Sequence, residues 1–146
     1  MPILVLFVFT IILDQVTKFY IQGSMFMGMS QPVIPVIFHI TYILNPGAAF
    51  GILENQRLFF IFVAVAILVI AAYFYSRLLK EPLLLRYGAG LLLGGAVGNL
   101  IDRIRIGAVV DFFDFRVWPI FNFADIAIVI GVGLVIYSVF LQTKDD

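Results

Sequence analysis

Two carboxylates in the last third of the chain, Asp111 and Asp125, are placed so that they could share one site. The short segment between them joins the ends of two apolar stretches and can bring the carboxylates together. Two carboxylates held close cannot both ionise cheaply, so one keeps its proton at neutral pH. Such a pair supplies a base that takes a proton from water and an acid that polarises a carbonyl. This is the chemistry of aspartic peptidases, although structural ion-pair networks also gather carboxylates.

Further charged and amide side chains lie within or beside apolar stretches. Asp14 and Lys18 stand at i and i+4 and share one helix face, so they could form only a structural ion pair. Asn99 and Asp102 stand at i and i+3 and face the same way. Asp102 and Arg103 could pair at a helix end, and Asn99 could bond between helices without a catalytic role. For these positions the spacing leaves the structural alternative open.

The last apolar stretch opens with Asn122 and Asp125, again at i and i+3. A helix N-terminus favours such side chains, so capping alone could explain one of them. Asp114 lies close to Asp111 in the sequence, among apolar and aromatic residues, and receives no role from the pattern.

Four apolar stretches must position these side chains. A membrane-spanning helix needs about 20 mostly apolar residues. The sequence therefore predicts an all-α membrane protein, a single domain over residues 1–146, with four transmembrane helices at about residues 2–21, 58–76, 83–101 and 121–141.

Composition supports the membrane class. Apolar residues make up 63% of the 146 residues, charged residues only 12%, and the mean hydropathy is +1.12. Soluble domains are about a quarter charged. The net charge is zero, which gives no sign of a nucleic-acid partner. There is no Cys, and the single His39 cannot by itself form a His-rich metal site or a Ser-His-Asp triad, so we expect no metal and no cofactor.

The region of about residues 22–57 differs from its apolar flanks. It holds three prolines and a β-branched, aromatic run over residues 33–44, followed by the turn signal Asn45-Pro46-Gly47. This pattern predicts a small β-rich platform between the first and second helices, at one membrane face. Residues 103–119 should return to that same face after two further crossings. Basic residues are equal in number in the two shorter links, so the positive-inside rule leaves the orientation open.

Five motifs follow one another along the chain: Asp14-Gln15-Val16-Thr17-Lys18, Asn45-Pro46-Gly47-Ala48-Ala49-Phe50-Gly51, Gly94-Gly95-Ala96-Val97-Gly98-Asn99-Leu100-Ile101-Asp102-Arg103, Val109-Val110-Asp111-Phe112 and Phe121-Asn122-Phe123-Ala124-Asp125. Each is weak alone, but together, in this order and on a chain of four spans, they resemble the lipoprotein signal peptidases, the type II signal peptidases of bacteria. The resemblance covers nearly the whole chain.

The resemblance implies an aspartic endopeptidase of the bacterial cytoplasmic membrane. It would cut diacylglyceryl-modified prolipoproteins just before the lipidated Cys, as a monomer among membrane lipids. Both termini would be cytoplasmic, the site would face the periplasmic or outer side, and residues 23–56 would form a substrate cradle and flap. Asp111 and Asp125 match the catalytic dyad, and Asp114 does not. Positions expected to bind substrate or brace the site are Asn45, Gly47, Asn99, Arg103, Asn122, Asp14, Lys18 and Asp102.

One departure from the family pattern concerns the stretch between the two dyad positions. Residues 116–119 make it shorter than in many members, which puts the substrate loops in doubt but not the reaction. Two other functions compete with the peptidase hypothesis. A small proton or solute transporter also uses intramembrane carboxylates, and an assembly factor could use them only to hold helices together.

Overall fold

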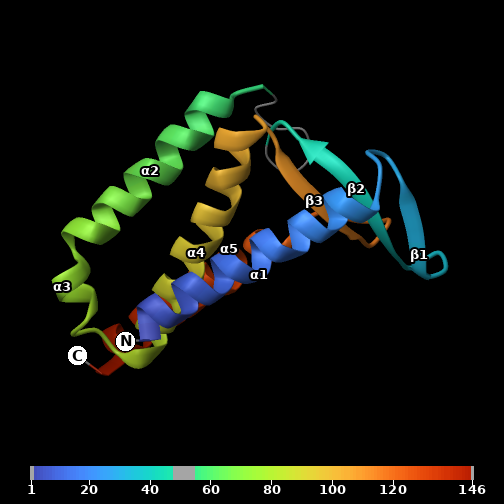
Figure 1. Cartoon of the computed structure of the whole chain (residues 1–146). Coiled ribbons are helices and arrows are strands. Elements are labelled where there is room, and N and C mark those ends of the chain that lie inside the picture. Colours follow the sequence, from blue (N-terminus) through green and yellow to red (C-terminus); the bar gives the residue numbers. More distant parts are fainter. Residues whose placement is uncertain (1, 48–54, 146) are drawn as a thin grey trace.

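Three long apolar helices form the frame of the protein (Figure 1). The computed structural model describes residues 2–47 and 55–145. The long helices are α1 (Pro2–Ser24), α4 (Leu83–Arg105) and α5 (Phe123–Asp145). Each is long and apolar enough to cross a membrane. The start of α1 and the end of α5 lie at the same end of the molecule (Figure 1).

The last residue of α4 and the first residue of α5 differ from the sequence prediction, because polar side chains at these positions stabilise the helix ends. The sequence predicts that the third span ends at about residue 101, but α4 continues through Asp102 and Arg103 to Arg105. Asp102 is paired with a cation from α1, and basic side chains in a last helical turn are favourable. Helix α5 begins at Phe123 because Asn122 caps it.

The predicted second span is a shorter helix, α2 (Arg57–Tyr73), of 17 residues. The chain breaks at Phe74, and a single further turn, α3 (Tyr75–Leu78), leads to the link before α4. None of the α2 residues, all of which the structure describes, is buried within the protein. The structure therefore supports three long apolar helices and does not by itself confirm a fourth span.

Helix α4 lies between α1 and α5, and small residues allow the close approach. A Cβ atom added at Gly94 would lie 2.8 Å from the backbone oxygen of Phe7 in α1. At Gly95, one residue on, an added Cβ would meet the backbone oxygen of Ala124 in α5. The sequence motif of small residues thus brings the middle helix into backbone contact with both neighbours.

A three-stranded antiparallel sheet covers one end of the helices. Its strands are β1 (Ser30–Ile34), β2 (Phe38–Asn45) and β3 (Val109–Asp114), in the order β1-β2-β3. The sequence predicted the β-rich region before α2 but not β3, which comes from the link between α4 and α5. The register pairs Ile43 with Asp111 and His39 with Asp114. Two links far apart in sequence therefore meet in one sheet.

A small apolar core joins this sheet to the end of α1. It consists of Ile21 near the end of α1, Met25 just after that helix, Tyr42 from β2, and Val110 and Phe112 from β3. Val110 is fully buried, and both of its neighbours in β3 are nearly so. The core fixes β3 relative to α1, which positions Asp111, the β3 carboxylate that lies between Val110 and Phe112.

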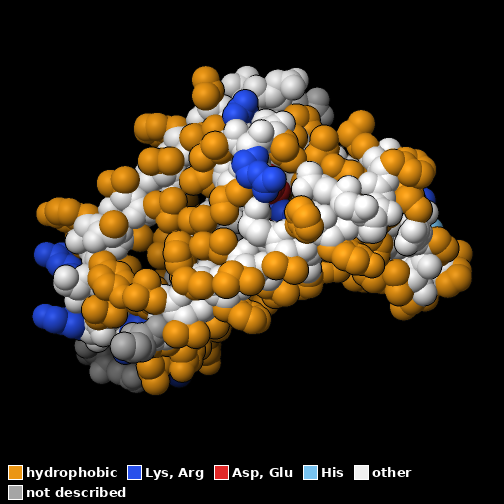
Figure 2. All heavy atoms as spheres, viewed as in Figure 1, with side chains coloured by type: hydrophobic (Ala, Val, Ile, Leu, Met, Phe, Trp, Pro, Cys, Tyr) orange, Lys and Arg blue, Asp and Glu red, His pale blue; other side chains and the backbone are white. Residues whose placement is uncertain are grey.

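Hydrophobic side chains dominate the outer surface of the helices (Figure 2). Lys and Arg side chains gather instead near α3 and near the end of α4 beside the sheet. In water so large an apolar surface would drive association, whereas lipid covers it at no cost. The distribution is that of a membrane protein with a polar region at each end.

Candidate active site

Lys18 of α1 is the centre of a buried polar cluster. Its ammonium nitrogen lies 2.9 Å from Asp14 Oδ2, 2.9 Å from Asp102 Oδ2 and 2.9 Å from Asn99 Oδ1. These three partners satisfy all three donors of the ammonium group. Lys18 is only 1% exposed, so it links α1 to α4 in an environment where an unpaired charge would be very costly. The predicted Asp14–Lys18 pair is present, and Asp102 belongs to the same cluster rather than to a pair with Arg103.

The two carboxylates of this cluster also hold the next elements. Asp14 Oδ1 accepts a hydrogen bond of 3.0 Å from the backbone N–H of Ala124, in the first turn of α5. Asp102 Oδ2 accepts one of 3.1 Å from the backbone N–H of Val110 in β3. Gln15, which sequence reasoning assigned no role, donates to both carboxylates at 3.2 Å. Its position beside Asp14 inside a span was the available signal.

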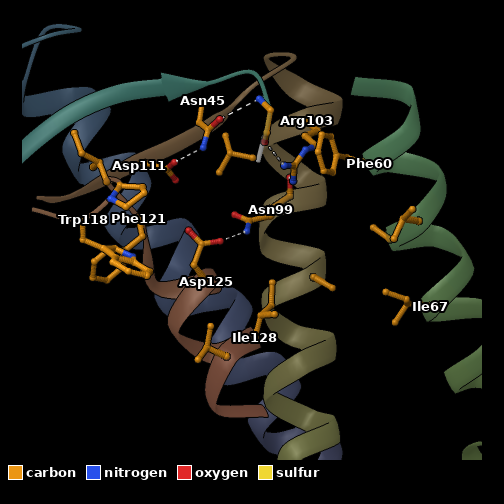
Figure 3. A pocket seen from close by; sticks show the side chains of 18 residues that line it. Asn45, Phe60, Ile67, Asn99, Arg103, Asp111, Trp118, Phe121, Asp125 and Ile128 are labelled. Carbon is orange, nitrogen blue, oxygen red and sulfur yellow. Dashed lines mark hydrogen bonds between the residues drawn. The ribbon is translucent and has the colours of Figure 1, made fainter. Parts of the chain in front are cut away.

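Two amides connect this cluster to the predicted dyad (Figure 3). Asn99 accepts from Lys18 and donates through Nδ2 to Asp125 Oδ1 at 2.8 Å. Asn122 donates through Nδ2 to Asp111 Oδ1 at 2.6 Å and also to Asn99 Oδ1 at 3.1 Å. Asp111 and Asp125 are thus joined through two neighbouring amides that hydrogen-bond to each other.

The first turn of α5 aims Asp125. Asn122 Oδ1 accepts the backbone N–H of Asp125 at 3.0 Å, and Asp125 Oδ2 accepts the backbone N–H of Asn122 at 3.1 Å. This reciprocal pair is a capping box. The capping explanation of the i, i+3 spacing is therefore correct for this pair, but it accounts for only one oxygen of Asp125. The other oxygen is directed to Asn99.

Asp111 lies in β3, outside the long helices, and is 1% exposed. Its second oxygen accepts a hydrogen bond of 2.9 Å from Asn45 Nδ2 at the end of β2. Burial raises the pKa of Asp111 to about 7, and the negative charge of Asp125 contributes to the rise, while the bonds from Asn45 and Asn122 oppose it. At neutral pH this carboxyl therefore holds a proton for much of the time.

Both carboxylates line one cavity of about 420 Å³. Figure 3 shows Asp111 and Asp125 on one side of it, with Phe60 and Ile67 of α2 across from them. Apolar residues form most of the remaining wall, including Trp118 from the link before α5. The cavity could hold an extended peptide with apolar side chains beside two carboxylates.

Arg103 and Gly47 form the rim of this cavity. The Arg103 guanidinium donates to the backbone oxygen of Gly47 at 3.1 Å and lies 4.6 Å from the ring centre of Phe60. Gly47 in turn donates its N–H to Asn45 Oδ1 at 3.0 Å. This chain joins α4, α2 and the end of β2. The remaining residues of the predicted Asn45–Gly51 motif, 48–51, and most of the predicted flap lie outside the described residues.

Asp114 does not share this site. It accepts hydrogen bonds from Thr41 and Arg116. Burial alone would raise the pKa of Asp114, but these bonds outweigh it and hold the pKa below its usual range. Among the residues that the structure describes, no group of three or more His, Cys, Asp or Glu side chains has the arrangement of a metal site.

The fold and the site define a helical membrane protein with two carboxylates in one cavity. The chain belongs to the signal peptidase II family. The model of this family, described as "Signal peptidase (SPase) II", matches residues 6–141. It is therefore a peptidase. The lipoprotein signal peptidase of Desulfitobacterium hafniense (strain DSM 10664 / DCB-2) is 48% identical over 92% of this chain and 89% of its own length. That of Moorella thermoacetica is 48% identical over 100% of this chain and 97% of its own length.

Two solved structures, both described as a bacterial membrane enzyme, have the same fold. One, at 2.3 Å resolution, is 39% identical, with a TM-score of 0.89 over 99% of this chain and 90% of its own chain. The other, at 1.9 Å, is 40% identical, with a TM-score of 0.82 over 94% of this chain and 91% of its own. The comparisons confirm the predicted family and give no support to the transporter alternative.

Proposed function

We propose that this peptidase removes the signal peptide from diacylglyceryl-modified bacterial prolipoproteins, cutting just before the lipidated Cys. The names of its relatives support the substrate class. We further propose that Asp111 and Asp125 are the catalytic residues. The observation that carries this assignment is the pair of amides, Asn99 and Asn122, that links the two carboxylates on one cavity wall.

The reaction follows from the protonation of the pair. Asp125 accepts a proton from a water molecule whose oxygen attacks the scissile carbonyl carbon, and Asp111 donates its proton to the carbonyl oxygen. The resulting gem-diol collapses when Asp111 takes back a hydroxyl proton and Asp125 passes its proton to the amide nitrogen. The carbon–nitrogen bond then breaks, and both carboxyls return to their starting states. Asp111 is the acid in this scheme because it is the group whose pKa is raised.

The other predicted residues have supporting roles in this proposal. Asn99 and Asn122 orient the carboxylates. Lys18, held by its ion pairs with Asp14 and Asp102, in turn fixes the amide of Asn99. Asn45 and Gly47 line the cavity where the substrate peptide would lie, and Arg103 holds Gly47 in place. No cofactor enters the reaction.

The helix α2 is the fourth membrane span in this proposal. Its 17 residues carry no charge after Arg57 and rise roughly 25 Å, close to the hydrocarbon thickness of a bilayer, and α3 extends it. Four spans put both termini on one side of the membrane. We propose that this is the cytoplasmic side, with the sheet and the carboxylates on the outer side. We propose that the protein acts as a monomer.

The substrate enters sideways from the bilayer. Four residues of α2 line the cavity although none is buried, so this helix forms a lightly packed wall. A lipid-anchored peptide can pass this wall while its acyl chains stay among membrane lipids. The scissile bond then meets the carboxylates at the outer end of the helices, where water has access.

A gel-shift cleavage assay with a purified diacylated prolipoprotein tests the proposal. The wild type should release the signal peptide, whereas Asp111→Asn and Asp125→Asn should insert and fold but leave the substrate uncut. Cleavage at the normal rate by either variant would refute the dyad. Wild-type enzyme that leaves the diacylated protein intact would refute the substrate class.

A further inference from the structure

Asp114 is a buried carboxylate that the proposed reaction does not use. It ends β3 and is 4% exposed. Its Oδ2 accepts from Thr41 Oγ1 at 2.7 Å and from Arg116 Nη1 at 2.9 Å, and its Oδ1 accepts from the backbone N–H of Arg116 at 2.8 Å. Burial of a carboxylate is costly unless such bonds compensate it. Two of the three bonds go to Arg116, so the group is built to hold that residue.

The backbone of Arg116 has a strained conformation that neighbouring groups must stabilise. Its φ of 65° is in the left-handed region, which residues with a side chain adopt at a cost. An Asp side chain that accepts the N–H two residues ahead stabilises such a turn. Asp114 makes this contact and adds an ion pair to the same residue.

The sheet anchors Asp114 from the other side. Thr41, on β2, donates to Asp114 and is also 2.7 Å from Ser30 Oγ on β1. The hydrogen bonds therefore cross all three strands before they reach the Arg116 turn. A contact rooted in this way can impose one conformation on a loop.

The loop that begins at Arg116 is closed at its base. Phe113 donates its N–H to the oxygen of Phe121 at 2.8 Å and accepts from the N–H of Phe121 at 3.2 Å. Phe115 stacks on Phe121, with the rings 5.9 Å apart and 7° from parallel. Because these contacts hold the two ends of the loop, the turn at Arg116 directs the path of the residues that follow it.

The tip of the loop supplies part of the cavity wall. Trp118 lines the cavity beside Phe121 and across from α2 (Figure 3). Trp118 is 61% exposed, which leaves ring surface accessible to a peptide in the cavity. A tryptophan in such a position is a common anchor for binding.

We propose that Asp114 is a positioning residue that holds Trp118 against the cavity through the Arg116 turn and so sets the affinity for substrate. Trp118 contacts apolar side chains of the signal peptide, and Asp114 touches no substrate atom. The inference rests on the proposed function, because it takes this cavity as the peptide site. It assigns a role to the short stretch between the two carboxylates.

Trp118 is the only tryptophan in the chain, so its fluorescence reports on this loop alone. The first experiment uses Asp125→Asn, which should hold a synthetic diacylglyceryl lipopeptide with its signal sequence uncut. Adding Asp114→Ala should speed local depolarisation of Trp118 and weaken binding of the lipopeptide about fivefold. Glu81→Ala, at the far end of the helices beside Gln142, is the matched control and should change neither measurement.

The second experiment separates binding from catalysis in the active enzyme. Asp114→Ala should raise KM about fivefold and leave kcat within about twofold. In a Trp118→Ala background, Asp114→Ala should raise KM little further, because both substitutions remove the same contact between Trp118 and the substrate. Asp114→Asn keeps an acceptor for the Arg116 N–H but loses the ion pair with the Arg116 side chain, so it should fall between the wild type and Asp114→Ala. If Asp114→Ala does not fold, Thr41→Val, which removes one of the three bonds, should shift both measurements in the same direction.

Three results would overturn the inference. The first is that Trp118 depolarisation and lipopeptide affinity are unchanged in Asp114→Ala, or in Thr41→Val if that variant replaces it. The second is that the KM increases of Asp114→Ala and Trp118→Ala multiply in the double variant, and the third is that Asp114→Ala lowers kcat and leaves KM unchanged. Failure of the proposed function looks different. Cleavage by Asp125→Asn would refute the catalytic assignment, whereas the Trp118 signal would still report whether Asp114 controls the loop.

Discussion

Lys18 Nζ lies 2.9 Å from Asn99 Oδ1, and this contact decides which way the Asn99 amide faces. An ammonium group only donates, so the amide oxygen must turn towards Lys18 and the amide nitrogen away from it. The nitrogen then donates to Asp125 Oδ1 at 2.8 Å. A buried cation in α1 thereby orients a carboxylate in α5 that it does not touch.

Replacement of this cation should be severe. Lys18→Met leaves Asp14 and Asp102 buried without a counter-charge, and loss of one partner of such a pair costs about 3–5 kcal/mol. Thermal unfolding in detergent, followed by circular dichroism, should show a large fall in stability. Lys144→Met, at the exposed end of α5, is the control and should be near neutral. Adding Asp102→Asn to Lys18→Met should recover part of the loss, and no recovery would contradict the charge argument.

Activity should depend on pH through Asp111. Its pKa of about 7 means that the proton needed by the acid is present below that pH and lost above it. We expect kcat/KM for lipopeptide cleavage to fall as pH rises through about 7. A profile that stays flat from pH 6 to pH 9, roughly the window around that pKa, would argue against Asp111 as the acid.

The same raised pKa has a consequence for stability with a definite sign. Between the usual value of 3.8 and about 7 the folded protein binds a proton at Asp111 that the unfolded chain has released. The contribution of this group to the free energy of unfolding therefore falls as pH rises through that window. Unfolding measured across it should be less pH-dependent in Asp111→Asn than in the wild type. Equal slopes in the two proteins would contradict the assigned pKa.

The contact between α4 and α5 should tolerate no added methyl group. In Gly95→Ala the new Cβ would meet the backbone oxygen of Ala124 and push the first turn of α5 away, with Asp125 in it. A displacement of about 1 Å can cost on the order of a hundredfold in rate, so we expect kcat to fall strongly. Gly133→Ala is the matched control, since nothing lies within 4 Å of its added Cβ. That variant should keep its activity and gain up to about 1 kcal/mol of helix stability.

Arg103 should not be replaceable by lysine. The guanidinium stacks on Phe60 while it donates to the Gly47 oxygen, and an ammonium group cannot do both. Arg103→Lys should lower kcat/KM about tenfold, mainly through KM, because the cavity rim loosens. Arg105→Lys, at an exposed position of the same helical turn, should behave as wild type. Equal activity of the two variants would remove Arg103 from the rim.

Much of the architecture follows from local sequence. Apolar runs of bilayer length predicted the helices, and the β-branched run at residues 33–44 predicted strands close to where β1 and β2 lie. The i, i+3 and i, i+4 spacings put Asp14 with Lys18 and Asn122 with Asp125 on shared faces. These relationships depend on backbone geometry over a few residues, so a sequence displays them directly.

The site itself depends on contacts between distant segments. Residues 109–114 are rich in Val and Phe, which suits a strand, but β3 is held as a strand by its pairing with β2. The bond from Lys18 to Asn99 joins residues 81 positions apart, and that from Asp14 to Ala124 joins residues 110 apart. Burial, which raises the pKa of Asp111, is likewise a property of the packed fold. The amino-acid sequence supplied the carboxylates and the helices that carry them, and packing turned two of the carboxylates into one site because desolvation and hydrogen bonds act only at close range.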